Sequence, residues 1–360
     1  MTGRGPEQND VERTAIRFRR FAEGEVTGLP VYTRIVEAAA EDAELMVMMQ
    51  HAPLGQRRPN LLLAAVHDLL LGGAEHPLAA WYPTVSGRLP PGGDVFPVFR
   101  SFIDVHRDEI LDALRTRSTQ TNEPNRSALW SVAVRAAAAD RPDVPLALVE
   151  LGCSAGLNLL FDRYGYDWGA TGSPDDRLRC VVRGDDSPLR RPLPPIATRI
   201  GIDREPVALD DPRGLRWLKA CLWPEQMDRH RRFDAAVVVA RHHPPTIIAG
   251  DLVDELPDVI DGLDPRLHLV VVNSWVLTYL PRDRRAAIDP ILGVVGAERP
   301  VTWISAEGPG VVDWVGRPAD GELSTVVGMA MWRDGRRRDT TVATCHAHLE
   351  WLDWRRTLRS

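Results

Sequence analysis

The spacing of hydrophobic residues changes near residue 145 and divides the chain into two parts. From about residue 11 to residue 139, apolar side chains recur every three and four positions, for example in NLLLAAVHDLLLGG and FRSFIDVHRDEILDALRTRS. This spacing is typical of amphipathic helices. After Pro145, short apolar runs alternate with helical segments, which indicates a parallel sheet with crossover helices. We therefore predict an all-helical N-terminal domain over residues 1–140 and an α/β domain over residues 141–360.

The second part contains five candidate parallel strands and a final hairpin. The strands are expected at residues 146–149, 197–202, 246–249, 267–272 and 301–305. Runs at 324–332 and 340–345, joined by RDGRRR, predict an antiparallel hairpin with a charged turn. Right-handed crossovers would then give a Rossmann-like, doubly wound sheet, with its ligand crevice at the carboxyl ends of the strands. An insertion rich in Tyr, Gly and Pro occupies residues 164–195.

The segment LALVELGCSAGLNLL, residues 146–160, is the most informative in the chain. Its apolar run ends in Glu150, and the turn Gly152-x-Ser154-x-Gly156 precedes a helix-like stretch. This order predicts a strand, a tight turn and a helix N-terminus. The two glycines permit backbone angles and close approaches that a Cβ would forbid, and the N–H groups of the new helix would face a small molecule.

Polar residues follow four of the predicted strands: Glu150, Asp203, Asp251 and Asn273. Because the carboxyl ends of parallel strands meet at one edge, we expect these side chains to converge on one crevice. Carboxylates accept hydrogen bonds from ribose hydroxyls, amino groups and an adenine amine, so such a set suits a nucleoside-like ligand. A single acid of this kind could equally cap a helix or face water.

These residues resemble the motifs of class I S-adenosylmethionine-dependent methyltransferases. Glu150 and the turn from Gly152 to Gly156 match the acid and Gly-x-Gly-x-Gly turn of that family, with Ser154 in the place of the middle glycine. The resemblance extends over about residues 146–354 and implies a methyltransferase-type sheet with S-adenosylmethionine as cofactor. It further implies that Asp203 holds the ribose and that Asp251 contacts the adenine.

A closer resemblance runs through nearly the whole chain. The strings NLLLAAVHDLLL, TRSTQTNEPNRSALW, ELGCSAGLNLLFDRYGY, GIDREP and RWLKACLWPEQ are similar to an uncharacterised bacterial family, a domain of unknown function. The resemblance to that family implies no particular reaction. The chemistry is therefore inferred from the methyltransferase-like half, as methyl transfer to a small-molecule acceptor.

The acceptor would lie beneath the N-terminal helical part, which we interpret as a cap and substrate domain. In the polar string QTNEPNR, Glu123 could take a proton and Arg126 could pair with a carboxylate or phosphate. The same string could instead cap a helix through Asn122 or Asn125. Asn158 could point at the bound amino-acid group.

Asn273 completes the catalytic candidates, which are Glu123, Arg126 and Asn273. It falls where some amino-group methyltransferases carry Asn-Pro-Pro-aromatic, although both prolines are missing from NSW.

Two other functions remain open. The pattern Gly-x-Ser-x-Gly is also the nucleophile elbow of α/β-hydrolases, and Ser154, then Asp251 or Asp254, then His346 or His348 have the required order. That fold places strands before the elbow, whereas the preceding residues are helical here. The third function is a non-catalytic protein that binds S-adenosylmethionine or a nucleoside on the same scaffold.

Composition excludes several classes. The net charge of -6 and a pI near 6.0 give no general attraction to nucleic acid. Four dispersed cysteines form no Cys-x-x-Cys pair, and no histidine pair has a third ligand at helical spacing, so no metal is expected. The longest apolar stretch, residues 61–71, is too short to span a bilayer. We expect a cytoplasmic protein without a membrane partner; the oligomeric state stays open.

Overall fold

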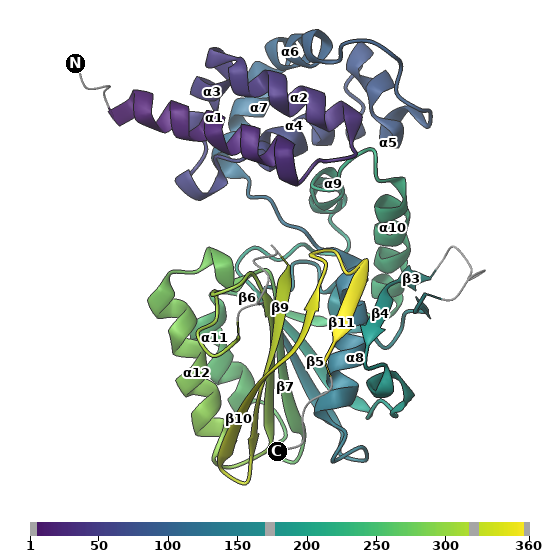
Figure 1. Ribbon diagram of the computed structural model, residues 1–360, viewed down its shortest axis with the longest axis vertical. Coiled ribbons are helices and arrows are strands. Elements are labelled where there is room, and N and C mark those ends of the chain that lie inside the picture. The colour runs from purple at the N-terminus through teal and green to yellow at the C-terminus, as the bar shows by residue number, and fades with distance from the viewer. Residues whose placement is uncertain (1–5, 170–176, 317–323, 356–360) are drawn as a thin grey trace. The chain divides into compact units, whose positions relative to one another are not determined.

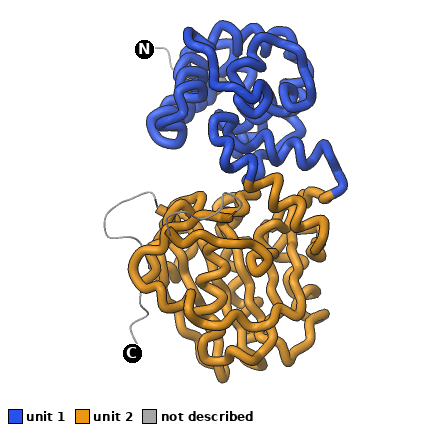
Figure 2. Tube along the Cα trace, turned by 90° about the vertical axis from the view of Figure 1, so that its right-hand side faces the viewer, with its two compact units in different colours: residues 1–121, 210–231 blue, residues 122–209, 232–360 orange. Residues whose placement is uncertain are grey.

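The computed structural model describes residues 6–169, 177–316 and 324–355, which form two compact units (Figure 2). Unit 1 comprises Met1–Thr121 and Asp210–Arg231, and unit 2 comprises Asn122–Leu209 and Arg232–Ser360. This division differs from the predicted boundary at residue 140. The helix at Ser127–Ala137 buries its apolar side chains in the core of unit 2, and the helix at Pro212–Ala220 contributes Trp217 to the core of unit 1.

Unit 1 is helical, as its apolar spacing predicts. Its α-helices are α1 (Pro6–Gly24), α2 (Pro30–Glu41), α3 (Ala43–Met48), α4 (Pro59–Leu71), α5 (Pro83–Ser86), α6 (Phe96–Val105), α7 (Arg107–Thr116) and α9 (Pro212–Ala220), with the start of α10 (Met227–His242). Short 3-10 turns are η1 (Met49–His51), η2 (Leu54–Gln56) and η3 (Pro77–Trp81). An ion pair between Arg216 and Asp68 at 2.8 Å ties α9 to α4. Within the described residues, no helix has the length and apolarity needed to cross a membrane.

Unit 2 is mixed α/β, with a nine-stranded, mostly parallel central sheet (Figure 1). The strand order is β4-β11-β10-β9-β8-β7-β1-β5-β6. The strands of this sheet are β1 (Leu146–Leu151), β4 (Val181–Gly184), β5 (Ile196–Asp203), β6 (Thr246–Ala249), β7 (His268–Ser274), β8 (Val301–Glu307), β9 (Thr325–Arg333), β10 (Arg336–Cys345) and β11 (Trp351–Trp354). The helices are α8 (Ser127–Ala137), most of α10, α11 (Leu252–Asp261) and α12 (Arg282–Gly296), with η4 (Pro124–Arg126), η5 (Leu157–Leu160), η6 (Ser187–Arg190) and η7 (Leu277–Tyr279). All seven strands expected from the apolar runs are present.

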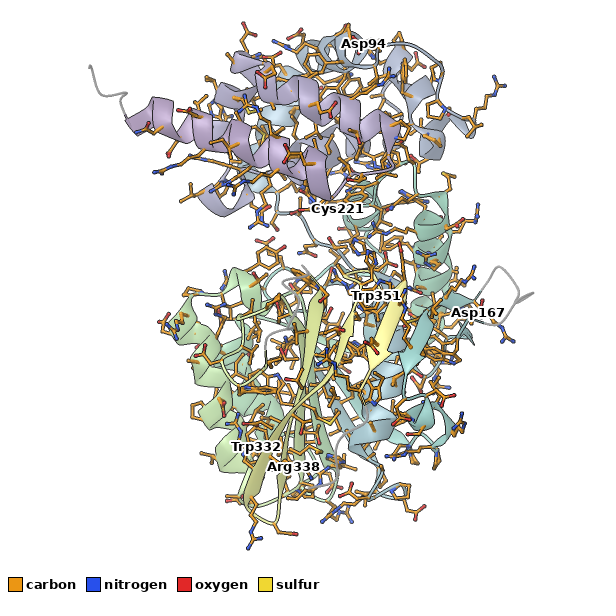
Figure 3. The ribbon with its side chains drawn as sticks, viewed as in Figure 1. Asp94, Asp167, Cys221, Trp332, Arg338 and Trp351 are labelled. Atoms are coloured by element: carbon orange, nitrogen blue, oxygen red, sulfur yellow. The ribbon has the colours of Figure 1, made fainter. Side chains whose placement is uncertain are left out.

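The apolar residues of β1 alternate between two layers of helices. Leu146 and Leu148 pack in the core beneath α8, whereas Ala147 and Val149 pack in the core formed with α11 and α12. Successive side chains of a strand point to opposite faces, so β1 is buried on both. Trp332 of β9 (Figure 3) lies on the α12 side, and a Cβ on Gly296 would approach its Cβ to 2.6 Å.

The final hairpin and the insertion extend the sheet on one side. Asp334 and Gly335 form the β9–β10 turn with φ of 51° and 71°, as in the charged turn predicted from RDGRRR. β11 then pairs antiparallel with β10, and β4 of the insertion pairs parallel with β11. The insertion also forms the two-residue strands β2 (Tyr166–Asp167) and β3 (Leu178–Arg179), which pair with each other.

The helix predicted after Gly156 is the main error of the sequence interpretation, because the structure forms only the four-residue turn η5 there. Side chains donate hydrogen bonds to backbone carbonyls of this segment, which in an α-helix would accept from backbone N–H groups of the same helix. The hydroxyl of Tyr164 donates to the Leu157 carbonyl at 2.7 Å, and that of Tyr166 donates to the Phe161 carbonyl at 2.6 Å. Arg199 donates to the Leu159 carbonyl at 3.1 Å. The turn after β1 therefore does not lead into the N-terminus of an α-helix.

The two glycines of the turn are required by conformation and by packing. Gly152 and Gly156 both have φ of 72°. A Cβ on Gly152 would lie 2.6 Å from the Cβ of Val276, and one on Gly156 would lie 2.7 Å from Pro245. The turn therefore fits closely against the loops that flank β7 and β6.

Gly152→Ala should lower the free energy of unfolding by the sum of two costs. Left-handed strain contributes about 1–2 kcal/mol and overpacking against Val276 about 1–3 kcal/mol. Gly335→Ala is the matched control, since Gly335 has φ of 71° but no described atom lies within 4 Å of the position that a Cβ would take there. Urea denaturation measures both. Equal losses in the two variants would contradict the packing role of Gly152.

Candidate functional site

The chain order around β1 places a topological switch point at this strand. After the insertion that contains β4, the chain forms β5 and β6 on one side of β1, then returns to β7 and β8 on the other. Ligands of open parallel sheets bind where the order reverses, at the carboxyl ends of the strands. Glu150 lies at that end of β1 and opposes Gly201 of β5 and Val272 of β7.

Glu150 is a buried carboxylate with incomplete hydrogen bonding. Its side chain is 3% exposed, and Oε2 has no hydrogen-bond partner among the described residues. By alternation along β1 it shares the α8 face with Leu148. Burial raises the pKa of Glu150 well above its ordinary value, the nearby Asp203 raises it further, and Arg126 and Trp130 oppose the shift.

Two buried amides beside the same turn also carry unpaired acceptors. Asn122 donates from Nδ2 to the Cys153 carbonyl at 2.7 Å, but no described group bonds to its Oδ1. Asn158, which follows the turn in η5, likewise has an unpaired Oδ1 within the described part of the chain. Since buried polar atoms are nearly always hydrogen bonded, three orphaned oxygens around one turn indicate a place for a donor. We call Glu150, Asn122 and Asn158 the acceptor cluster.

Asp203 holds the turn from the end of β5. Its Oδ2 accepts the Ser154 N–H at 2.7 Å, and its Oδ1 accepts the Glu205 N–H at 2.9 Å. These bonds fix Ser154, whose φ of 53° is unusual for a residue with a Cβ. An ionised carboxylate can accept about four hydrogen bonds, so Asp203 retains capacity for a ligand.

Glu123 and Arg126 lie in the interior of unit 2. Glu123 is fully buried, accepts the Asn125 N–H at 3.2 Å as the N-cap of η4, and lies 3.9 Å from Arg232. Arg126 is 7% exposed and donates from Nε to the Ala347 carbonyl at 3.0 Å. Both side chains thus bind other parts of unit 2, and Arg126 also acts electrostatically on Glu150.

Asn273 is not brought together with Glu150, contrary to the expected convergence. Its Nδ2 donates to Ser305 Oγ at 3.0 Å and to Glu307 Oε1 at 2.9 Å. Its Oδ1 accepts from Trp303 Nε1 at 2.8 Å. Because Trp303 belongs to the core beneath α11 and α12, Asn273 points to the face opposite Glu150. Its amide is fully used within the sheet.

The carboxylate of Asp251 binds groups outside the acceptor cluster. It caps α11 by accepting the Val253 N–H at 3.0 Å, and it pairs with Arg204 at 2.8 Å and with Arg284. Although burial opposes the shift, these hydrogen bonds lower the pKa of Asp251 to about 2. Its oxygens therefore serve the start of α11, and the structure gives no support for an adenine contact.

Glu307 is a residue that the sequence interpretation missed, although it ends β8 much as Glu150 ends β1. Burial raises its pKa, and hydrogen bonds partly offset this effect. It accepts the N–H groups of Val276 and Leu277, both at 2.9 Å, and thereby fixes the loop after β7. Extending the rule of strand-end acids to the fifth predicted strand would have found it.

The hydrolase alternative lacks its acid and base. Asp251 and Asp254 both pair with Arg284, and within the described segments neither acid bonds to a histidine. Ser154 is only 6% exposed. The part of the chain that the structure describes also contains no group of three His, Cys, Asp or Glu side chains able to hold a metal ion.

Fold and site together define a mixed α/β protein with a candidate ligand site at the end of a switch-point strand. The chain belongs to the family described as "Uncharacterized protein conserved in bacteria (DUF2332)", whose model matches residues 15–354. No curated protein matches it. A similar solved structure is magnesium protoporphyrin IX methyltransferase (ChlM) from Synechocystis PCC 6803 with bound SAM, at 14% identity over 59% of this chain and 76% of that chain. The TM-score of this match is 0.26.

Glu150→Gln should change how stability depends on pH. A carboxyl whose pKa is raised on folding stabilises the protein below its unfolded pKa, and this contribution is lost as pH rises through the folded pKa. The free energy of unfolding of the wild type should therefore fall relative to Glu150→Gln by up to about 1.4 kcal/mol per pH unit across that interval. Chemical denaturation at a series of pH values measures this difference. The exposed Glu298→Gln is the control, and parallel profiles for all three proteins would refute the assignment.

Proposed function

We propose that the protein binds S-adenosylmethionine at the carboxyl end of β1 and transfers its methyl group to a small-molecule acceptor. The observation that carries this proposal is the buried, incompletely bonded carboxylate of Glu150 on the switch-point strand. When bound, S-adenosylmethionine supplies an electrophilic methyl group on a sulfonium ion. Its ammonium and ribose hydroxyl groups are hydrogen-bond donors, and the site presents acceptors.

The residues present fit this ligand in part. The acceptor cluster and Asp203 supply oxygens around the turn, and ionised Glu150 would suit a cationic ligand. The turn itself leaves little space for a ligand, because Val276 and Pro245 pack against Gly152 and Gly156. Asp251 and Asn273 have no part in the proposed site.

In this proposal the chain's own residues bind, orient and exclude water. Methyl transfer is an in-line displacement, so holding the two reactants in contact supplies most of the catalysis. Asp203 fixes the turn while accepting from the ligand, and Asn122 links that turn to the segment preceding α8. Glu123 and Arg126 support this segment rather than touch the reacting atoms. The charge of -6 favours a small acceptor over a nucleic acid.

Calorimetric titration of the full chain with S-adenosylmethionine and S-adenosylhomocysteine tests the proposal. Glu150→Gln and Asp203→Asn should each weaken binding about tenfold to a hundredfold, the loss of a hydrogen bond to a charged group. Asp254→Asn is the matched control, since Asp254 lies 65% exposed beside Arg284. Circular dichroism checks that the variants fold. Absence of binding by the folded wild type, or equal affinity in all variants, would overturn the proposal.

The affinity for S-adenosylmethionine should also depend on pH through Glu150. A cationic ligand favours the ionised carboxylate, whereas burial favours the protonated form and raises the pKa. Affinity should therefore rise by up to about tenfold per pH unit until Glu150 is ionised. In Glu150→Gln this dependence should be absent. If the affinity of the wild type does not change with pH, Glu150 does not bind the cationic part of the ligand.

A further inference from the structure

Unit 2 contains a pocket that shares no lining residue with the acceptor cluster. Its volume is about 130 Å³, and it lies between α8, the η5 segment and the insertion. Ser131 and Arg135 of α8 form one wall, and the rings of Phe161, Tyr164, Tyr166 and Trp168 line it together with two leucines from the η6 region. Asp167 (Figure 3), between the last two aromatic residues, locates this part of the chain. Pockets for drug-sized ligands are about 300–1,000 Å³, so this one suits a smaller molecule.

Arg135 brings a positive charge to this pocket without an acid beside it among the described residues. Its Nη1 donates to Ser131 of its own helix, to the carbonyl at 3.1 Å and weakly to Oγ at 3.4 Å. Its Nε is buried and has no partner within the described chain. Arg135 is half-buried, and this burial lowers its pKa. A desolvated guanidinium of this kind favours an anion.

The one acid that lines the pocket does not neutralise this charge. Asp162 pairs with Arg199 through both of its oxygens, at 2.6 and 3.1 Å. Arg163 lies 3.4 Å from the same carboxylate. Asp162 is therefore already shared between two arginines other than Arg135.

The aromatic wall is fixed in place before any ligand arrives. Tyr166 and Trp168 stack with ring centroids 4.8 Å apart and an interplanar angle of 17°. The hydroxyls of Tyr164 and Tyr166 are hydrogen bonded to the Leu157 and Phe161 carbonyls. These bonds hold the two tyrosine rings in place. Rings held in advance reduce the entropic cost of binding.

We propose that this pocket binds a small aromatic carboxylate, with Arg135 holding the carboxylate and the fixed rings contacting its apolar body. A guanidinium matches a carboxylate through two parallel hydrogen bonds. An inorganic anion would satisfy the charge but leave the aromatic wall unused. This site is independent of the proposed methyl transfer.

The test compares benzoate with benzamide, a neutral molecule of nearly the same shape, by NMR titration of the full chain. Benzoate should bind at least tenfold more tightly than benzamide, and Arg135→Gln should remove this preference. Arg190→Gln is the control, because Arg190 lies in η6 and pairs with Asp186 at 2.6 Å without lining the pocket. Leu189→Trp, which fills the pocket, should weaken the binding of both compounds.

The opposite outcomes would overturn the assignment. These are equal affinities for benzoate and benzamide, retention of the preference in Arg135→Gln, no detectable binding of benzoate to the wild type, or competition by inorganic phosphate as strong as that by benzoate. If Arg135→Gln does not fold, Leu189→Trp decides, since retained benzoate binding in that variant would place the ligand elsewhere. None of these variants alters Glu150 or Asp203, so S-adenosylmethionine binding is measured separately.

Discussion

The desolvation of one carboxylate, Glu150, is the constraint on which the candidate site depends. β1 is an interior strand of the sheet and is covered by helices on both faces, so each of its side chains must find its partners inside the protein. Five of its six residues are apolar and need none. An acid near the carboxyl end of such a strand costs free energy unless other groups or a ligand supply hydrogen bonds. Asn122 and Asn158, which lie around the turn after β1, each carry an unpaired amide oxygen.

Glu307 shows what a structural acid looks like in the same sheet. It ends a strand two places from β1 and is equally buried, yet it accepts several N–H groups from Asn273 and the loop after β7. The two acids are therefore equally buried but differ in how many of their hydrogen bonds are formed. Glu307 accepts several hydrogen bonds and fixes a loop, while one carboxylate oxygen of Glu150 accepts none from the described residues. This contrast distinguishes a binding candidate from a supporting residue more clearly than position alone.

The sequence predicted the sheet well where burial is strong and less well where contacts are distant. Strands β1, β7, β8 and β9 were visible as apolar runs because strands covered on both faces must be apolar. The runs of β5, β6 and β10 were also visible, although these strands are partly exposed. The strands β4 and β11 contain charged residues and gave no such signal. The missing helix after Gly156 depends on the hydroxyls of Tyr164 and Tyr166, whose carbonyl targets no local propensity specifies.

The grouping of site residues failed for a related reason. All four strand-end residues were assigned to one crevice, but Glu150 opposes Val272, so Asn273 points to the other face. The position of each polar residue after a strand can be predicted from the sequence. The face to which it points depends on the register between neighbouring strands, which is established only when the sheet assembles.

The division of the chain has a consequence for how the protein is synthesised. Unit 1 is completed by residues 210–231, which follow β5 of unit 2 along the chain. When the ribosome has made α1 to α7, the nascent helices still lack α9, and with it Trp217 and the ion pair of Arg216 with Asp68. The helical unit therefore cannot reach its final core until β1 and β5 of unit 2 have been synthesised. A nascent chain that ends before residue 210 therefore lacks part of both units.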